Sequence, residues 1–226
     1  RAAALTSAGV AVDEVLMAVM AAERTPATLA LSSELLGMLG EQPRQALPVI
    51  LKKITTSTAS GIYAPWKLSA AARLLEVFPN ERGLRGALVP MLAAARQVVD
   101  DREELPARRL AAIQLLAQAT EKTGDDVSLF LSVINVSSPI ELQVAALQPV
   151  LQDGNELVIM QLLAGWSQYS PVLRSSMVAT MLERHSLTRL MLEALPKNKE
   201  LLASLDASHR EFLLQHKDEI IRKLAT

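Results

Sequence analysis

The sequence predicts an all-α protein built from repeated helical hairpins, and three observations support this prediction. Alanine, leucine, glutamate, glutamine, arginine and methionine dominate the chain, whereas aromatic residues make up only 3% of it. This composition favours helices over strands. Prolines open apolar segments at regular intervals, and a second apolar segment follows each of them. Half of the 226 residues are hydrophobic, so the chain is long enough to bury a continuous core.

The prolines give the period of the repeat. Pro26, Pro65, Pro106, Pro139 and Pro171 are separated by 39, 41, 33 and 32 residues. Proline is favoured at the first position of a helix, because its missing N–H would be unpaired there in any case. Three of these prolines follow a residue that can cap a helix N-terminus, namely Thr25, Ser138 and Ser170. Each proline is therefore predicted to start a helix.

Apolar pairs recur at the same distance from the first three prolines. Nine and ten residues further along lie Leu35 and Leu36, Leu74 and Leu75, and Leu115 and Leu116. The later segments are looser, with Leu147, Val150 and Leu151 in one, and Met177, Met181 and Leu182 in the other. The same turn of each helix is therefore predicted to face the core.

A second helix is predicted between successive proline-started helices. These helices cover residues 42–58, 82–99, 125–135, 154–166 and 187–195, and Ser186 can cap the last of them. The most strand-like stretch, residues 127–136, is also predicted to be helical because Asp125 and Asp126 precede it as first-turn acids. Two more short helices follow near the C-terminus, with Asp206 and Asp218 near their starts.

Short hairpins of this kind need neighbours. Helices of fewer than about 12 to 15 residues are marginal in water, so packing between hairpins has to stabilise them. Repeats of about 40 residues are typical of a right-handed α-α superhelix, a solenoid of the HEAT or armadillo kind. We therefore expect about seven hairpins in a single domain over residues 1–226. The alternative is a compact helical bundle, with helices of similar length and no fixed period, and the proline register favours the solenoid.

Charge and cysteine content exclude several function classes. The chain has 23 basic and 24 acidic residues, so it lacks the basic surplus typical of nucleic-acid or membrane-surface binding. It has no cysteine, which excludes disulfides, thiolate metal sites, thiol catalysis and a covalently attached c-type haem within these residues. No apolar run approaches the roughly 18 residues of a membrane span. Asp13 and Glu14 interrupt the first apolar stretch, so we expect the first helix of an excised fragment there and not a signal peptide.

Candidate chemical residues are few. His185, His209 and His216 form no HExxH motif and no i, i+4 pair, so surface or hydrogen-bonded histidines are predicted in preference to a metal site. Glycine-rich phosphate loops are absent from the sequence. The acidic cluster Asp100, Asp101, Glu103 and Glu104 could be a carboxylate pair, but a solvated loop before Pro106 is favoured.

Two aromatic pairs could mark a ligand platform. Tyr63 lies three residues before Trp66, and Tyr169 three residues after Trp166. Packing at the hairpin ends is the favoured interpretation, and the eight methionines are interpreted as core residues. The sequence therefore predicts no catalytic, cofactor-binding or metal-binding residue, and no cofactor in this domain.

The last 75 residues or so carry a family resemblance. The stretch "LLAGWSQYSPVLRSSMVATMLERHSLTRLMLEAL", followed by "LDASHREFLLQHKDEIIRKLA", resembles the HEAT-like repeat region of membrane-bound dehydrogenases of planctomycete-type bacteria, which are haem-binding multidomain proteins. The matching positions are Trp166, Ser170, Pro171, Arg174, Leu182, Arg184, Leu192, Leu195, Arg210, Leu213, Leu214, His216, Asp218, Ile221 and Ala225. The resemblance implies a parent protein with a sugar-dehydrogenase-like β-propeller and a CxxCH haem domain. It also implies a periplasmic or otherwise extracytoplasmic location, and it transfers no functional residue to this chain.

Three function classes follow. The leading hypothesis is a non-catalytic scaffold or spacer that orients neighbouring domains or binds a protein partner within such a dehydrogenase. The alternative is a stand-alone HEAT-type protein- or peptide-binding module unrelated to redox chemistry. The third class, a helical enzyme, would need a pocket with clustered carboxylates or histidines. The expected partner is a protein, either an adjacent domain or a docking protein, and not nucleic acid.

Overall fold

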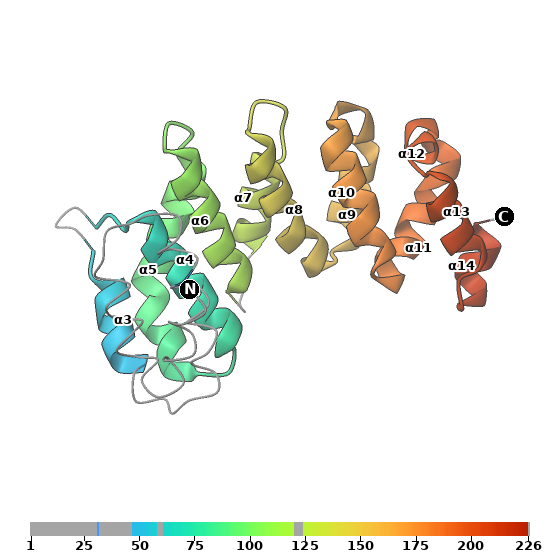
Figure 1. Ribbon diagram of the computed structural model, residues 1–226. Coiled ribbons are helices and arrows are strands. Elements are labelled where there is room, and N and C mark those ends of the chain that lie inside the picture. Colours follow the sequence, from blue (N-terminus) through green and yellow to red (C-terminus); the bar gives the residue numbers. More distant parts are fainter. Residues whose placement is uncertain (1–30, 32–46, 58–60, 120–123, 226) are drawn as a thin grey trace. The chain divides into compact units, whose positions relative to one another are not determined.

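Every regular element that the structure describes is a helix (Figure 1). The computed structural model describes Leu31 and residues 47–57, 61–119 and 124–225. Its α-helices are α3 Leu47–Thr55, α4 Pro65–Val77, α5 Arg82–Asp100, α6 Pro106–Gln118, α7 Gly124–Val133, α8 Ile140–Asp153, α9 Glu156–Ala164, α10 Pro171–Leu182, α11 His185–Ala194, α12 Lys199–Ala203, α13 Ala207–Leu214 and α14 Glu219–Leu224. Two short 3-10 helices, η2 Trp166–Gln168 and η3 Leu195–Lys197, join them. The all-α prediction is confirmed for this part of the chain.

The chain divides into two compact units, Arg1–Lys122 and Thr123–Thr226. In the first unit α4 packs against α6, α5 packs against α4 and α6, and α3 contacts α4 and α5. The leucine pairs predicted from the proline register are in its core, since Leu74, Leu75, Leu115 and Leu116 are at most 5% exposed. The predicted helix starts at Thr25 and Pro26 and the pair Leu35 and Leu36 lie outside the described residues.

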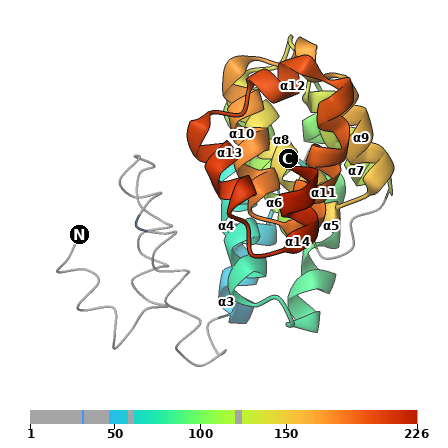
Figure 2. The same ribbon diagram turned by 90° about the vertical axis from the view of Figure 1, so that its right-hand side faces the viewer.

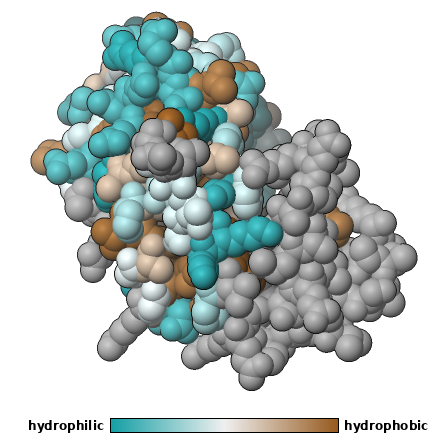
Figure 3. All heavy atoms as spheres, turned by 90° about the vertical axis from the view of Figure 1, so that its left-hand side faces the viewer, coloured by the Kyte–Doolittle hydropathy of each residue, from teal (hydrophilic) through white to brown (hydrophobic). Residues whose placement is uncertain are grey.

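The side of the chain that carries α3 shows apolar side chains in small separate spots among hydrophilic ones (Figure 3). Three large apolar residues of the first unit, Ile62, Val89 and Leu105, are exposed. Single apolar side chains of this kind are common on protein surfaces, so they do not by themselves mark a binding site.

In the second unit, helices contact both their chain neighbours and the helix after next (Figures 1 and 2). α7 packs on α8, and α10 packs on α11. In addition α8 contacts α10, α9 contacts α11, and α11 contacts α14. The core of this unit includes Phe130, Leu147, Trp166, Met177 and Met181, all with no exposed surface.

Three of the register prolines begin helices as predicted. Pro65, Pro106 and Pro171 are the first residues of α4, α6 and α10. Ser170 caps α10, because its Oγ accepts a hydrogen bond from the backbone N–H of Leu173 at 3.3 Å. The fixed backbone angle of proline and a side-chain acceptor just before it therefore act together at this helix start.

The start of α8 differs from the prediction. This helix begins at Ile140, with Pro139 as its N-cap residue and no side-chain cap. Ser138, the predicted cap, instead accepts a hydrogen bond from Asn135 Nδ2 at 3.1 Å. The prediction was wrong here because hydrogen bonds within the preceding turn compete for the serine hydroxyl.

The predicted second helices are present where the structure describes them. α5 matches the predicted range 82–99 closely. α7 confirms a helix over residues 127–133 of the strand-like stretch 127–136, whereas residues 134–136 form a turn beyond it. Asp206 and Asp218 are the N-caps of α13 and α14. Asp206 accepts the backbone N–H of His209, and Asp218 accepts those of Ile220 and Ile221.

The predicted cap of α11 is wrong. This helix begins at His185, after an N-cap residue Arg184 that makes no side-chain cap, so Ser186 lies inside its first turn. Thr188 connects the two helices of the hairpin, because its Oγ1 donates to the carbonyl oxygens of Met181 at 2.9 Å and Arg184 at 3.1 Å. The α10–α11 bend is thus stabilised by Thr188, two residues after the predicted cap Ser186.

A side chain at the fourth position of three helices ties each helix to the segment before it. Arg109 of α6 donates to Val99 O at 2.9 Å, Gln143 of α8 to Ser138 O at 2.8 Å, and Arg174 of α10 to Ser167 O at 2.8 Å. The residue type varies, but each helix places a side-chain N–H at the same position.

Candidate functional site

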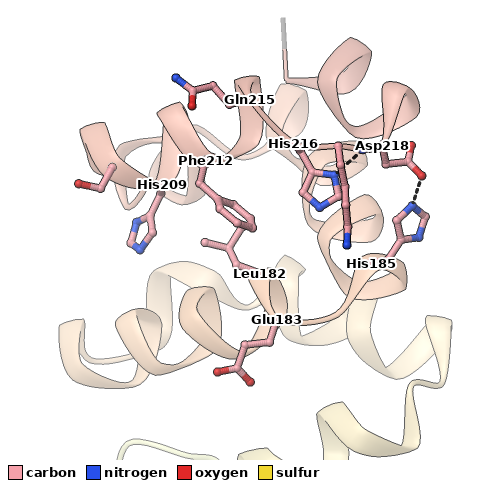
Figure 4. A pocket seen from close by; sticks show the side chains of 10 residues that line it. Leu182, Glu183, His185, His209, Phe212, Gln215, His216 and Asp218 are labelled. Atoms are coloured by element: carbon pink, nitrogen blue, oxygen red, sulfur yellow. Dashed lines mark hydrogen bonds and ion pairs between the residues drawn. The ribbon is translucent and has the colours of Figure 1, made fainter.

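A pocket of about 1280 Å³ lies near the C-terminal end of the second unit (Figure 4). Its walls come from the α10–α11 bend, from α13 and from the loop between α13 and α14. Its lining includes Leu182, Phe212 and the titratable residues Glu183, His185, His209, His216, Lys217 and Asp218. All three histidines of the chain therefore line this pocket.

Packing of the last two helices positions this pocket. α14 contacts both α11 and α13, and it buries Ile221 completely. Leu213 of α13 is only 2% exposed. The apolar sides of α13 and α14 are thus used for packing, and the loop of residues 215–218 lies beside the α10–α11 bend (Figure 4).

His185 and Asp218 join the bend to the start of α14. His185 Nε2 lies 2.8 Å from Asp218 Oδ2, so this nitrogen carries the proton that the carboxylate accepts. The other oxygen, Oδ1, accepts the backbone N–H of Ile220 at 2.7 Å and of Ile221 at 3.4 Å. Asp218 is therefore both a helix cap and the partner of a histidine from another hairpin.

These bonds keep Asp218 charged. The backbone N–H of Ile220 has the largest effect in holding the pKa of the Asp218 carboxyl below its ordinary value. The hydrogen bond from His185 and the N–H of Ile221 act in the same direction. Partial desolvation opposes them but does not outweigh them.

His216 has a different role in the same loop. Its Nδ1 accepts the backbone N–H of Asp218 at 3.1 Å, so this nitrogen is deprotonated. The ring packs edge-on against Phe212 at 5.6 Å between centroids, and lies 6.4 Å from the ring of His185. Arg222 Nη1 donates to the carbonyl oxygen of His216 at 2.6 Å and fixes the loop from the side of α14.

His209 lies at the other end of the pocket. The Nδ1 atom of His209 lies 3.2 Å from Asp206 Oδ1. The same oxygen accepts a hydrogen bond from the backbone N–H of His209 at 2.8 Å. His209 and His216 do not share a helix, since α13 ends at Leu214.

The arrangement does not converge on a metal ion. Within the described residues, no group of three or more histidine, aspartate or glutamate side chains is placed to hold one. A metal ligand needs a free nitrogen lone pair, and the Nδ1 lone pair of His216 is occupied by the Asp218 amide. In the neutral ring the proton is then on Nε2.

The acidic cluster is a solvated loop, as favoured from the sequence. Asp100 and Asp101 end α5, and both are exposed. Asp101 Oδ1 accepts the backbone N–H of Glu103 at 2.9 Å, and Glu104 pairs with Arg108 at 2.5 Å. These carboxylates therefore shape the turn into α6.

The aromatic pairs contribute to packing. Trp166 has no exposed surface, and its indole N–H donates to Ser204 Oγ at 3.0 Å. Tyr63 is also buried, and partial burial raises the pKa of the Tyr169 phenol. Trp66 is half-buried, with the Lys67 amine 5.6 Å from its ring centroid. Four described methionines, Met91, Met177, Met181 and Met191, have no exposed surface, whereas Met160 is 38% exposed.

Comparisons with protein-family models, curated proteins and solved structures give no match. The resemblance to the dehydrogenase-associated repeat region therefore stays a prediction. Within the described residues, no helix combines the length and the apolar character needed to cross a lipid bilayer.

Several positions that carry the resemblance have structural roles in the second unit. Trp166 fills the core, Ser170 caps α10, and Arg184 Nη1 donates to the carbonyl oxygens of Leu151 at 2.6 Å and Gln152 at 3.1 Å. His216 and Asp218 belong to the pocket. The quoted pattern therefore describes mainly how hairpins are joined.

Proposed function

We propose that this chain is a non-catalytic helical-repeat scaffold of the HEAT type, which orients neighbouring domains or binds a protein partner. In this proposal the hairpins stack into a right-handed superhelix. The parent protein is a membrane-bound dehydrogenase with a haem domain, as the resemblance implies, and the location is extracytoplasmic.

One observation carries the proposal. The tenth and eleventh residues of four helices are buried in every case, and these pairs are Leu74 and Leu75 of α4, Leu115 and Leu116 of α6, Pro149 and Val150 of α8, and Thr180 and Met181 of α10. A stack of helical repeats predicts such a common buried position, because each repeat packs on its neighbours in the same way. Contacts between alternate helices, such as α8 with α10 and α9 with α11, support the same conclusion.

Small-angle X-ray scattering tests the architecture. A compact domain of 226 residues has a radius of gyration of roughly 17 Å. A stack of hairpins is longer, so we expect a clearly larger value and an extended tail in the distance distribution. A value near that of the compact domain would contradict the solenoid and support a helical bundle.

Activity assays test the non-catalytic role. We expect the isolated chain to show no turnover of sugars or alcohols with soluble electron acceptors. Turnover that depends on any of His185, His216 or Asp218 would contradict the scaffold proposal, because these titratable groups lie together in the pocket.

The redox context has a separate test. If the scaffold belongs to a haem-binding dehydrogenase, a CxxCH motif is expected downstream in the same reading frame. A reading frame that lacks this motif would support the alternative of a protein-binding module unrelated to redox chemistry. The half-exposed Phe212 beside Leu182 in the pocket is the observation that favours this alternative.

A further inference from the structure

The loop between α13 and α14 contains a histidine that acts as a hydrogen-bond acceptor. His216 Nδ1 accepts the backbone N–H of Asp218 at 3.1 Å, which closes a turn of three residues. Histidine changes its charge near neutral pH, and the charged ring carries a proton on both nitrogens. Protonation therefore replaces this acceptor by a donor that faces another donor.

We propose that this loop is an acid-sensitive joint, in which protonation of His216, whose ring packs edge-on against Phe212, breaks its bond to the Asp218 amide. Both rings line the pocket, so opening of the joint changes the pocket wall. This property belongs to the fold of the second unit and goes beyond the proposed scaffold role.

The groups around His216 come from every segment that lines the pocket. They are Glu183 after α10, His185 of α11, His209 of α13, Lys217 and Asp218 of the same loop, and Arg222 of α14. Asp218 is the negative group nearest in the chain, and Lys217 and Arg222 are the positive ones. The carboxylate of Glu183 points away from the ring of His216 (Figure 4).

His185 responds to acid in the opposite way. Its Nε2 already donates to Asp218 Oδ2 at 2.8 Å, and the charged ring keeps this donor. Acid therefore strengthens the contact between the α10–α11 bend and Asp218. The acid-sensitive bond is the one made by His216, and the cap that Asp218 Oδ1 provides for α14 persists.

Two substitutions of His216 distinguish the effect of its hydrogen-bond acceptor from the effect of its charge. In His216→Asn, the side-chain oxygen can accept the N–H two residues on, as in an Asx turn, and it does not titrate. In His216→Phe, an aromatic ring remains beside Phe212 but the acceptor is lost at every pH. His185→Asn is the matched control, since it removes the other histidine of the cluster and leaves the His216 bond in place.

Hydrogen exchange of the Asp218 amide in the full chain is the measurement, expressed as a protection factor so that the intrinsic pH dependence cancels. A hydrogen bond with a net contribution of about 1 kcal/mol corresponds to a roughly fivefold change in the protection factor. We expect protection about fivefold lower at pH 5.5 than at pH 7.5 in the natural chain and in His185→Asn. In His216→Asn protection should stay high at both pH values, and in His216→Phe it should be low at both.

Ring proton shifts of His216 measured in the same samples show when it titrates. The proposal is overturned if the Asp218 amide keeps its protection while the ring becomes charged. It is also overturned if the ring does not titrate in this range, or if His216→Asn loses protection as the natural chain does. Far-UV circular dichroism of each variant establishes that the helices are intact.

Discussion

Trp166 is the largest fully buried side chain in the described part of the chain. A buried indole N–H needs an acceptor, and Ser204 Oγ provides it at 3.0 Å. The same hydroxyl donates to the carbonyl oxygen of Glu200 at 2.8 Å, so its orientation is fixed. A single serine after α12 therefore allows a tryptophan to fill the core beside η2.

Ser204→Ala tests this role. The substitution leaves the Trp166 N–H without its acceptor, which costs roughly 1 to 3 kcal/mol of the free energy of unfolding. Urea denaturation followed by the fluorescence of Trp166, in a Trp66→Phe background, measures the change. Ser208→Ala on the exposed side of α13 is the control, and we expect it to stay within about 0.5 kcal/mol. Equal effects of the two substitutions would show that the Trp166 bond does not contribute.

Asp218 predicts a pH dependence of stability. Its pKa is lower in the folded chain, so the charged carboxylate stabilises the fold above the unfolded value of about 3.9. This contribution is lost as the pH falls through the folded pKa. Asp218→Asn keeps an oxygen that can cap α14 but removes the charge. We expect its Tm to lie below that of the natural chain at pH 7, and the gap to close only below about pH 4. A gap that is independent of pH down to pH 2.5 would contradict the charge argument.

At the scale of single helices, the ends of α8 show how local chemistry sets boundaries. The helix ends at Gly154, which has a φ of 70° in the left-handed region. Glycine adopts this conformation without the steric strain of a Cβ atom. At the other end Ser138 does not act as a cap, because Asn135 uses its hydroxyl. In α8, the residue type therefore predicts the C-terminal end at Gly154 better than it predicts an N-terminal cap at Ser138.

Gly154→Ala should be destabilising because of its backbone angle alone. A Cβ atom there would lie 3.6 Å from Arg184 Nη2, which is an ordinary contact, so the expected cost of roughly 1 to 2 kcal/mol is that of the left-handed conformation. Gly86→Ala in α5 is the opposite case, since nothing lies within 4 Å of its Cβ position. There we expect a gain of about 0.5 to 1 kcal/mol. Chemical denaturation of both variants measures the change in the free energy of unfolding. A change in the same direction for both variants would refute the explanation.

At the scale of the whole molecule, side-chain hydrogen bonds join one hairpin to the next in the second unit. Arg184 extends from the α10–α11 bend to the last turn of α8, where its Nη1 donates to the carbonyl oxygens of Leu151 and Gln152. The last carbonyl groups of a helix have no partner within it, and the C-terminal end of its dipole attracts a cation. One arginine therefore links the α10–α11 hairpin to α8.

Arg184→Met removes this link but keeps an apolar stem. Hydrogen bonds to charged groups contribute roughly 1.5 to 3 kcal/mol, and we expect a loss of that size in the second unit. Arg189→Met is the control, because Arg189 makes an exposed i, i+4 pair with Glu193 at 3.4 Å. Such pairs contribute about 0.3 to 0.5 kcal/mol. Hydrogen exchange of the α8 and α10 amides locates the effect, and a loss confined to α11 would contradict a link between α8 and the α10–α11 hairpin.

The candidate site was the part least predictable from the sequence. Periodicity indicates only which side of α13 is apolar. Nothing in the spacing of His185, His209 and His216 shows that they meet, because His185 and Asp218 are 33 residues apart in the chain. Their meeting depends on α14 packing against α11. The useful signal was the predicted cap at Asp218, which marks the start of α14.

The sequence by itself determined the all-helical character of the described residues, the starts at Pro65, Pro106 and Pro171, and the caps at Ser170 and Asp218. These features depend on interactions within about one helical turn, and such interactions are determined by residues that are neighbours in the sequence. Only the tertiary structure decided that Ser204 satisfies Trp166, that Arg184 closes α8, and that three histidines share a pocket. An apolar stripe specifies that a helix face is covered, but the fit of side chains between hairpins decides which helix covers it.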